Sequence, residues 1–406
     1  MSKTETPSIR FRGFEDAWEQ RKLGEMGQTY TGLSGKTKDD FGHGQARFVT
    51  YMNVFSNPIS NPEMTEPIEI DPKQNEVEVG DVFFTTSSET PEEVGMSSIL
   101  LEKRGKTYLN SFCFGFRPSE KIDSYYLAYM LRSESTRAKI ILLAQGISRY
   151  NISKNKVMEI AVSLPSLDEQ KMIGQYFSQL DNLITLHQRK FEKLTNVKKS
   201  MLEKMFPRNG SCYPEIRFKG FTDPWEQRKF EDAFIERREK TVTENEDTLL
   251  SCAINGMFLN SELFGHFRGT TTIGYLKVKK NDLILSAQNL HLGNANVNLR
   301  FEHGIISPAY KVYDLNNCEP EFVQAWVKKE DTKNFFLAAT TEGASQCRKN
   351  IEWDTLGKQT ICMPAIKEQA TIGSFFKCVD NLITLHQREL EKLQGTKKAL
   401  LEKMFV

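Results

Sequence analysis

The chain lacks the long apolar runs and the paired cysteines that mark several large classes of protein. No apolar run reaches the ~18 residues that a membrane-spanning helix needs, and the first residues, MSKTETPSIRF, have no apolar core of the signal-peptide kind. Its seven cysteines are scattered over 406 residues and never form a C-x-x-C pair. That pattern argues against a disulfide framework and a zinc site. We therefore expect a soluble, cytoplasmic protein with reduced thiols, no membrane contact and no bound metal.

The chain also has no excess of charge of either sign. The chain has 54 basic and 53 acidic residues, for a formal net charge of +1. A nucleic-acid-binding surface would therefore have to be a local patch rather than a property of the whole molecule. At roughly 150 residues per domain, the length predicts two or three domains, each able to bury its own core.

Catalytic motifs are absent as well. Gly35-Lys36-Thr37 resembles the end of a phosphate-binding loop, but Tyr30 stands where that motif needs its first glycine. The nearest matches to an amino-methyltransferase motif are NPIS at residues 57–60 and SPAY at residues 307–310. Neither has the residues to hold and stack a flipped adenine. We expect a chain that is not an enzyme and that binds no cofactor of its own.

What the chain does contain is a repeat. Residues 9–23 read IRFRGFEDAWEQRKL and residues 216–230 read IRFKGFTDPWEQRKF, identical at 11 of 15 positions; we call these box 1 and box 2. Residues 164–206 and 363–405 are identical at 25 of 43 positions. Between the repeats lie two stretches with almost no similarity, residues 24–163 (the first insert) and 231–362 (the second insert). Duplicated scaffold parts with divergent inserts indicate a protein that holds two different things in one fixed geometry.

The second pair of repeats predicts two long helices. Apolar residues recur at alternating spacings of three and four for more than four heptads, which is typical of a coiled coil. At ~1.5 Å per residue, about 37 residues make a helix roughly 55 Å long. The two seams should pack on each other, antiparallel if the repeats are related by an approximate two-fold axis. The expected pairing residues are Phe177, Leu180, Ile184, His187, Phe376, Val379, Ile383 and His386.

Two polar residues interrupt each seam at the same place, His187 and Lys198 in the first helix and His386 and Lys397 in the second. The simpler interpretation is that they set the register or the orientation of pairing. A metal or catalytic role for the two histidines is the alternative, but no carboxylate or cysteine stands beside them at ligand spacing.

Both inserts have a mixed α/β pattern. We expect strands at residues 47–54, 77–86 and 98–102 of the first insert and a helix over residues 125–143. In the second insert we expect strands at residues 248–253, 274–285 and 309–313 and a helix over residues 321–337. A loop rich in Gly, Ser, Arg and Asn follows each of these helices, at residues 146–151 and 343–350.

Basic and polar side chains in loops are the candidates for DNA contact, because such side chains hydrogen-bond phosphates and base edges. For any one of them a solvated surface role is the alternative. The two loops before the long helices are stronger candidates, because they recur in both halves. The candidate residues are Lys36, Lys38, Arg47, Ser87, Lys103, Arg104, Lys106, Arg149, Tyr150, Asn151, Arg237, Arg238, Lys240, Gln288, Asn289, Gln346, Arg348 and Lys349.

The boxes, the two P-x-x-x-E-Q-x-x-I-G helix starts and the two L-E-K-M-F helix ends together resemble the specificity subunit of a type I restriction–modification enzyme. The resemblance covers the whole chain. It implies α/β (α+β) target-recognition domains in two copies, joined by two long antiparallel helices that form a coiled coil with internal pseudo-two-fold symmetry. The implied segments are a first recognition domain (1–163), a first helix (164–208), a second recognition domain (209–362) and a second helix (363–406).

The resemblance also implies partners and cofactors. Two modification subunits, which carry S-adenosylmethionine and methylate adenine, would be placed on double-stranded DNA, and two restriction subunits, which use ATP and Mg²⁺, would join them. Each insert would read one half of an asymmetric bipartite site, and the helices would set the spacer. The alternatives are a coiled-coil scaffold protein that binds no nucleic acid and a fused restriction–methylation enzyme, which would need the catalytic motifs that this sequence lacks.

Overall fold

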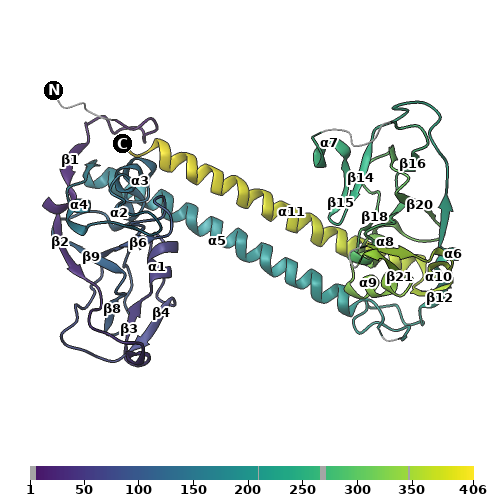
Figure 1. The fold of residues 1–406 in the computed structure, drawn as a ribbon, viewed down its shortest axis with the longest axis horizontal. Helices are drawn as coiled ribbons and strands as arrows, with labels where there is room; N and C mark the ends of the chain where they lie inside the picture. Colours follow the sequence, from purple (N-terminus) through teal and green to yellow (C-terminus); the bar gives the residue numbers. More distant parts are fainter. Residues whose placement is uncertain (1–5, 209, 266–270, 346–347) are drawn as a thin grey trace. The chain divides into compact units, whose positions relative to one another are not determined.

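The chain forms two compact units in a computed structural model that describes residues 6–208, 210–265, 271–345 and 348–406. Unit 1 comprises Met1–His187 with Glu389–Val406, and unit 2 comprises Gln188–Arg388 (Figure 1). Each unit therefore contains one insert, one box, the beginning of one long helix and the end of the other. This grouping differs from a division into four consecutive segments, which remains a prediction about the order of parts along the chain.

The two long helices are α5 (Leu167–Lys204) and α11 (Ile366–Lys403). The other elements of unit 1 are β1 (Glu19–Lys22), η1 (Leu23–Glu25), β2 (Gly27–Thr31), η2 (Lys38–Asp40), β3 (Phe41–Val49), α1 (Tyr51–Ser56), β4 (Thr65–Ile68), β5 (Val82–Thr85), β6 (Ser87–Ser88), β7 (Ser97–Ile99), β8 (Thr107–Leu109), β9 (Cys113–Pro118), α2 (Ser124–Met130), α3 (Glu134–Ile141), β10 (Tyr150–Asn151), α4 (Lys154–Met158) and β11 (Ala161–Leu164).

The other elements of unit 2 are β12 (Glu226–Lys229), α6 (Phe230–Ala233), β13 (Phe234–Arg237), β14 (Leu250–Ala253), β15 (Gly256–Leu259), α7 (Asn260–Leu263), β16 (Leu276–Lys279), β17 (Leu283–Ser286), η3 (Leu290–Leu292), β18 (Ala295–Val297), β19 (His303–Ile306), β20 (Tyr310–Leu315), α8 (Pro320–Val327), α9 (Glu330–Leu337), β21 (Thr340–Ser345), β22 (Arg348–Ile351), α10 (Trp353–Lys358) and β23 (Thr360–Met363).

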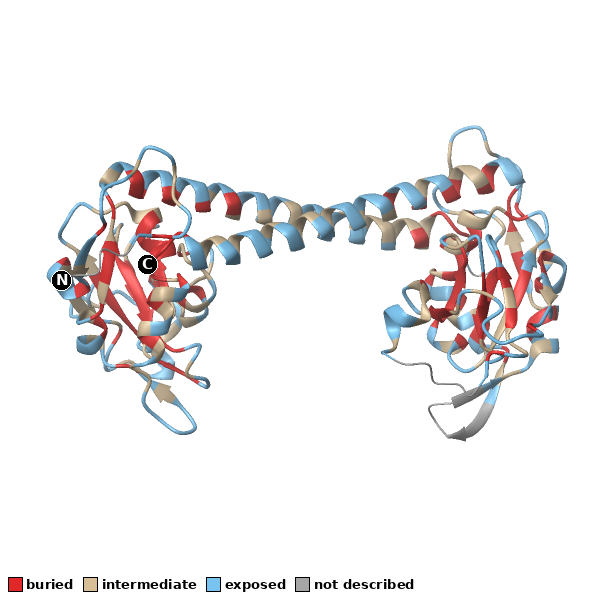
Figure 2. Cartoon of the chain, turned by 90° about the horizontal axis from the view of Figure 1, so that it is seen from above, coloured by how far each residue is buried: buried red, intermediate tan, exposed pale blue. Residues whose placement is uncertain are grey.

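The two inserts share a fold although they share almost no sequence. The main sheet has the order β2-β9-β5-β7 in unit 1 and β13-β20-β17-β18 in unit 2. All of its strand pairs are antiparallel in both units. Buried residues gather on these strands and on the helices beside them in each unit (Figure 2). The prediction of two mixed α/β domains is therefore confirmed, and their common topology extends the repeat into segments where sequence comparison fails.

Several predicted elements end earlier than the sequence pattern indicates. The strand expected at residues 47–54 ends at Val49, because the Thr50 hydroxyl accepts a hydrogen bond from the backbone N–H of Asn53 and caps α1. The strand expected at 77–86 is limited to β5. The strand expected at 274–285 is two strands separated by a turn at Asn281, whose φ is 72°. Both expected helices in the inserts are broken into two, α2 with α3 and α8 with α9.

Each box is attached to the start of a long helix. Strand β1 of box 1 pairs antiparallel with β11, with Glu19 opposite Leu164, and β12 of box 2 pairs with β23 in the same register, with Glu226 opposite Met363. β11 and β23 lead directly into α5 and α11. The identical EQRK segments therefore fix each insert to its helix through backbone hydrogen bonds.

A second attachment uses a buried ion pair in each unit. The guanidinium of Arg10 in box 1 binds both carboxylate oxygens of Glu169 in the first turn of α5, at 2.7 and 2.8 Å. Arg217 and Glu368 repeat this pair at 2.6 and 2.7 Å. Both carboxylates are almost completely buried, so each depends on its arginine for compensation.

The far end of each long helix lies in the core of the unit in which the other helix begins. Phe405, just after α11, packs on Tyr126 and Phe177 of unit 1, with ring centroids 5.6 Å from each. Phe206, just after α5, packs on Phe322 and Phe376 of unit 2 at 5.3 and 6.1 Å. Within each unit, the start of one long helix therefore lies beside the end of the other.

The boxes complete these helix ends. The backbone N–H of Ile9 donates to the carbonyl of Lys403 at the end of α11, and the N–H of Ile216 donates to the carbonyl of Lys204 at the end of α5. The last carbonyls of a helix have no partner inside the helix. Box 1 thus caps the helix of the second repeat, and box 2 caps the helix of the first.

The residues expected to pair the two long helices differ in burial, and Phe177 and Phe376 belong to the cores of unit 1 and unit 2. Phe177, Leu180, Phe376 and Val379 are buried. The remaining pairing candidates, Ile184, His187, Ile383 and His386, are half-buried, with exposed residues between them. Among the described residues, no helix is long and apolar enough to cross a membrane.

Candidate nucleic-acid interface

The structure brings four of the predicted DNA-contact residues of the first insert together at one edge of unit 1. The short strand β10 pairs with β6, which places Asn151 opposite Ser87 and Tyr150 opposite Ser88. Arg149 precedes β10, and its guanidinium carbon lies 5.7 Å from the centroid of the Phe112 ring. We call Ser87, Arg149, Tyr150 and Asn151 with Phe112 the β6–β10 edge.

The turn that presents Arg149 requires a glycine. Gly146 has a φ of 145°, and a Cβ at this position would lie 2.0 Å from the carbonyl oxygen of Arg149. Both the backbone N–H and the carbonyl of Gln145 bond to Asn151, which closes the loop. Ile147, at its tip, is 96% exposed, and Phe112 is 53% exposed. An arginine on a closed loop beside an aromatic ring is suited to contact a base or a phosphate.

The other basic candidates of the first insert lie near β3, β4 and β8, and most of them bind acidic or polar groups of the same unit. Lys36 binds Asp71 at 2.9 Å, Lys103 binds Glu76 at 2.8 Å, and Arg104 binds Glu63 at 2.5 Å. Lys106 lies 3.9 Å from Glu76, and Arg47 bonds to Thr65. Lys38, in η2, is exposed. Cations held in this way would have to exchange a protein partner for a phosphate, so they are weaker candidates than Arg149.

In the second insert, Arg237 has a role in the fold. Its guanidinium pairs with Asp282 and with Asp314. Asp282 is buried immediately before β17. Unit 1 has the equivalent arrangement, in which Asp81 is buried before β5 and pairs with Arg117 at 2.8 Å. In both units, a buried carboxylate just before the equivalent strand thus forms an ion pair with an arginine. The arginine comes from β13 in unit 2 and from β9 in unit 1.

The remaining candidates of unit 2 lie in three places. Arg238 is exposed and binds Glu236 at 2.7 Å, and Lys240 is exposed. Gln288 and Asn289 are exposed in the turn after β17, where β6 follows β5 in unit 1. Gln346 lies outside the described residues. Arg348 and Lys349 begin β22, the second strand of a hairpin with β21.

Each unit also has a groove where its insert meets the two long helices. The unit 1 groove has a volume of ≈ 450 Å³ and is lined by Arg132, Glu134, Asp181, Ile184, Gln394, Lys397, Lys398, Leu401 and Glu402. The unit 2 groove, of ≈ 650 Å³, is lined among others by Lys328, Glu330, Asp380, Ile383, Lys198, Lys199, Leu202 and Glu203. Seven helix positions of one groove are thus the repeat counterparts of seven in the other, and six of them carry the same residue; Gln394 corresponds to Thr195.

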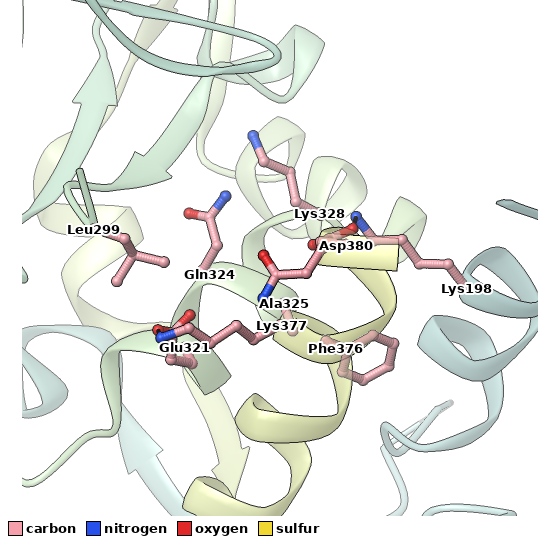
Figure 3. Close-up of a pocket in the computed structure, with 10 residues that line it drawn as sticks. Lys198, Leu299, Glu321, Gln324, Ala325, Lys328, Phe376, Lys377 and Asp380 are labelled. Carbon is pink, nitrogen blue, oxygen red and sulfur yellow. Dashed lines mark hydrogen bonds and ion pairs between the residues drawn. The ribbon is translucent and has the colours of Figure 1, made fainter. Parts of the chain in front are cut away.

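The inserts contribute matching charges to these grooves. Arg132 follows α2 and donates to the carbonyls of Ser97, Val54 and Phe55, and Lys328 follows α8 and donates to the carbonyls of Ile254 and Ala295. Burial lowers the pKa of Lys328 to about 8. Figure 3 shows the neighbouring hollow of ≈ 270 Å³, where Lys328 and Gln324 lie beside the Lys198–Asp380 ion pair. Sequence comparison misses this correspondence, because only the charge sign is shared between the inserts.

No group of three or more His, Cys, Asp or Glu side chains in the described ranges could hold a metal ion. His187 and His386 are half-buried on the long helices, and their role in setting the register stays a prediction.

Comparison with known proteins identifies the relatives of this chain. Residues 15–196 match the family model described as the type I restriction modification DNA specificity domain. The type I restriction enzyme MjaVIII specificity subunit of Methanocaldococcus jannaschii is 24% identical over 326 residues, which cover 75% of this chain and 74% of that protein. The EcoKI specificity subunit of Escherichia coli is 21% identical over 319 residues, which cover 73% of this chain and 68% of that protein.

A solved structure has the same fold. The S subunit of a type I restriction–modification system from M. genitalium superimposes with a TM-score of 0.61 at 13% identity, over 99% of both chains. The relatives are named as specificity subunits, which agrees with the prediction of a non-catalytic recognition chain.

Proposed function

We propose that the chain, which is similar to type I restriction enzyme specificity subunits, reads DNA in the same way, with each insert reading one half of an asymmetric, bipartite site. The observation that supports this most directly is the combination of one sheet topology with two unrelated sequences. A common fold presents loops at equivalent places, and divergent side chains on those loops would select different bases.

The β6–β10 edge is the part of the first insert that we propose to contact bases, with Arg149 as its main contact. If Arg149 binds a guanine through two hydrogen bonds, Arg149→Ala should cost ~1–3 kcal/mol and relax the specificity at one position only. If it binds a phosphate, affinity should fall for every sequence and the slope of log K against log [salt] should fall by about one.

The experiment measures binding of the chain, assembled with its modification subunits, to a library of duplexes at several salt concentrations. Lys103→Ala is the matched control, because Lys103 already binds Glu76 in the same insert. Arg149→Ala binding that is unchanged at every salt concentration would exclude the β6–β10 edge from the interface. A complex with no salt-dependent DNA binding at all would instead favour the alternative, a coiled-coil scaffold protein without nucleic acid.

We further propose that α5 and α11 pair antiparallel as a coiled coil and set the spacer between the two half-sites. Each helix has 38 residues, which at ~1.5 Å per residue corresponds to roughly 57 Å. Half-sites read from the same side of a duplex are separated by about 34 Å or a multiple of it, and helices of this length can span such a distance.

The third part of the proposal concerns partners. Two modification subunits, which supply S-adenosylmethionine and the methylation of adenine, need two similar docking surfaces, and restriction subunits with ATP and Mg²⁺ would join that complex. The two grooves are duplicated in helix residues and in charge. Carbonyl oxygens solvate the cations of Arg132 and Lys328 without neutralising them, so a carboxylate of the partner would be attracted into each groove.

Reversing one charge in each groove tests the docking. Lys398→Glu in unit 1 should remove one modification subunit from the complex, Lys199→Glu in unit 2 should remove one, and the double variant should remove both. Lys193→Glu with Lys392→Glu is the matched control, because these exposed helix lysines are also repeat counterparts but line neither groove. Native mass spectrometry gives the stoichiometry. If Arg189→Ala with Arg388→Ala removes the partners and the groove variants do not, docking lies on the outer helix faces.

A further inference from the structure

Unit 2 contains a pair of thiols that the DNA-reading proposal does not use. The sulfur atoms of Cys212 and Cys362 lie 2.7 Å apart. Cys212 belongs to the segment between the end of α5 and box 2, and Cys362 lies in β23, the strand that leads into α11. The two residues are 150 positions apart in the chain, so folding alone brings them together.

Several contacts hold this pair in place. The carbonyl of Cys212 accepts a hydrogen bond from the backbone N–H of Trp225 at 3.0 Å. The backbone of Cys362 is fixed opposite Gln227 in the β12–β23 ladder. The side chain of Gln227 in turn donates to the sulfur of Cys212 at 3.6 Å. The thiols are therefore positioned by box 2 and by the strand that pairs with it.

The pair is also accessible. Both cysteines are half-buried, and Cys362 lines a cavity of ≈ 410 Å³ together with Ser211, Gln227 and Lys329. By contrast, Cys113 and Cys252 are buried in the inserts, where burial raises the pKa of each thiol. Unit 1 has Ser163 at the position that corresponds to Cys362. The thiol pair is therefore found in unit 2 and is not repeated in unit 1.

We propose that Cys212 and Cys362 are a thiol–disulfide exchange site that a low-molecular-weight disulfide oxidises reversibly to an internal disulfide. The thiolate of Cys212 attacks one sulfur of the small disulfide, forms a mixed disulfide and releases one small thiolate. The sulfur of Cys362 then attacks that of Cys212, forms the internal bond and releases the second thiolate. The protein loses two electrons and two protons, and the small disulfide gains them as two thiols.

The consequence is confined to unit 2. The internal bond would tie the segment that follows α5 to the strand that precedes α11, and it would close a loop of about 150 residues, which raises resistance to unfolding. The burial of Cys362 and its hydrogen bond with Cys212 raise the pKa of the Cys362 thiol to about 12.

The test incubates the full chain with oxidised glutathione and analyses it by non-reducing peptide mapping. We expect a cross-linked peptide containing Cys212 and Cys362, two hydrogens lighter than the separate peptides, that dithiothreitol reverses. Exposed Cys378 on α11 is the internal control, because it should give only a glutathione adduct. In Cys362→Ser the Cys212 residue should keep its glutathione, because the thiol that lies 2.7 Å from its sulfur has been removed.

Thermal unfolding supplies the second measurement. The oxidised chain should melt at a higher temperature than the reduced chain, and oxidation of Cys212→Ser should leave its melting temperature unchanged. Separate glutathione adducts on Cys212 and Cys362 in the unaltered protein, or two free thiols when Cys378 is fully modified, would overturn the proposal.

Discussion

Lys198 of α5 and Asp380 of α11 form an ion pair of 2.5 Å in unit 2, and Lys397 of α11 and Asp181 of α5 form the same pair at 2.5 Å in unit 1. Adding 199 to the numbers of Lys198 and Asp181 gives Lys397 and Asp380. Each lysine therefore binds the aspartate of the other helix, not that of its own. Two such crossed pairs support the proposal that α5 and α11 pair antiparallel, with these polar seam positions contributing to that orientation.

The first prediction is a double-mutant cycle on this pair. Lys198→Glu would face Asp380 with a like charge and should reduce the free energy of unfolding by about 1 kcal/mol, since both side chains are partly exposed. Adding Asp380→Lys should restore most of the loss. The coupling energy should be ~0.5–1 kcal/mol in urea unfolding at low salt and smaller at high salt. If the changes in unfolding free energy of the two single variants simply add up in the double variant, the ion pair does not stabilise this arrangement of the helices.

A second prediction concerns the glycines of the long helices. Gly174 of α5 lies against the start of α2, where an added Cβ would be 2.6 Å from the backbone nitrogen of Tyr126. Gly373 of α11 has the same relation to Phe322 of α8, at 2.7 Å. Alanine at either position should lower the free energy of unfolding by ~1–3 kcal/mol, because backbone atoms cannot move aside cheaply.

Gly395 of α11 is the matched control for these variants. An added Cβ there would meet no atom within 4 Å. Gly395→Ala should therefore stabilise the helix by about 1 kcal/mol through helix propensity alone. Measuring the three variants by urea unfolding separates the packing effect from the propensity effect. Equal stabilisation by all three would mean that the inserts do not press on the helices at these points.

The third prediction concerns pH. Burial lowers the pKa of Lys328 from its ordinary 10.5 to about 8. Between pH 8 and 10.5 the unfolded chain keeps a proton on this residue that the folded chain has lost, so stability contributed by Lys328 should rise with pH in this window. Below about pH 8 both states are protonated, and the cost of burying the ammonium group is fully present.

Lys328→Met removes the titrating group and keeps a long side chain. The difference in unfolding free energy, wild type minus variant, should increase by ~1–3 kcal/mol from pH 7.5 to 10.5. Urea titrations at four or five pH values give this difference and cancel contributions common to both proteins. A flat or falling difference would show that the ammonium group is well solvated in the folded chain.

The sequence predicts the repeated parts of this fold well, because their signals are local. The heptad spacing defines α5 and α11, and the proline before each helix marks where it begins. The breaks between α2 and α3 and between α8 and α9 are less visible, because apolar residues continue through them. In unit 1 the break depends on Ser133, which caps α3 by accepting from the N–H of Thr136.

Tertiary pairing explains why parts of the candidate interface could not be predicted. Nothing local distinguishes Arg237 from Arg149 as a surface arginine. The guanidinium of Arg237 binds Asp282, 45 residues away, whereas that of Arg149 lies 5.7 Å from the centroid of the Phe112 ring. The grouping of Ser87 with Asn151 depends on the β6–β10 ladder. Such contacts require the sheet to be assembled before they can be recognised.

The last prediction concerns exchange of the inserts. Replacing residues 24–163 with the corresponding insert of a relative should change one half of the methylated motif and leave the other half and the spacer as they were. A working exchange also requires that the new insert pack on the long helices. The new insert must supply a helix that, like α2, packs a ring on Phe405 and crosses α5 at Gly174. Lengthening both long helices by whole heptads should do the reverse and change only the spacer.

Methylome sequencing of cells that carry each exchange gives the motif. An insert with an aromatic residue at the position of Tyr126 should yield a stable chimera, and the same insert with alanine there is the control that should fail to assemble. Assembly of the chimera and its DNA specificity can be tested separately. Assembly depends on the aromatic contact with Phe405 at the end of α11, whereas specificity is proposed to depend on the β6–β10 edge. If a stable chimera altered both halves of the motif, the two inserts would not act as independent readers, and the proposal of two separate half-site domains would have to be abandoned.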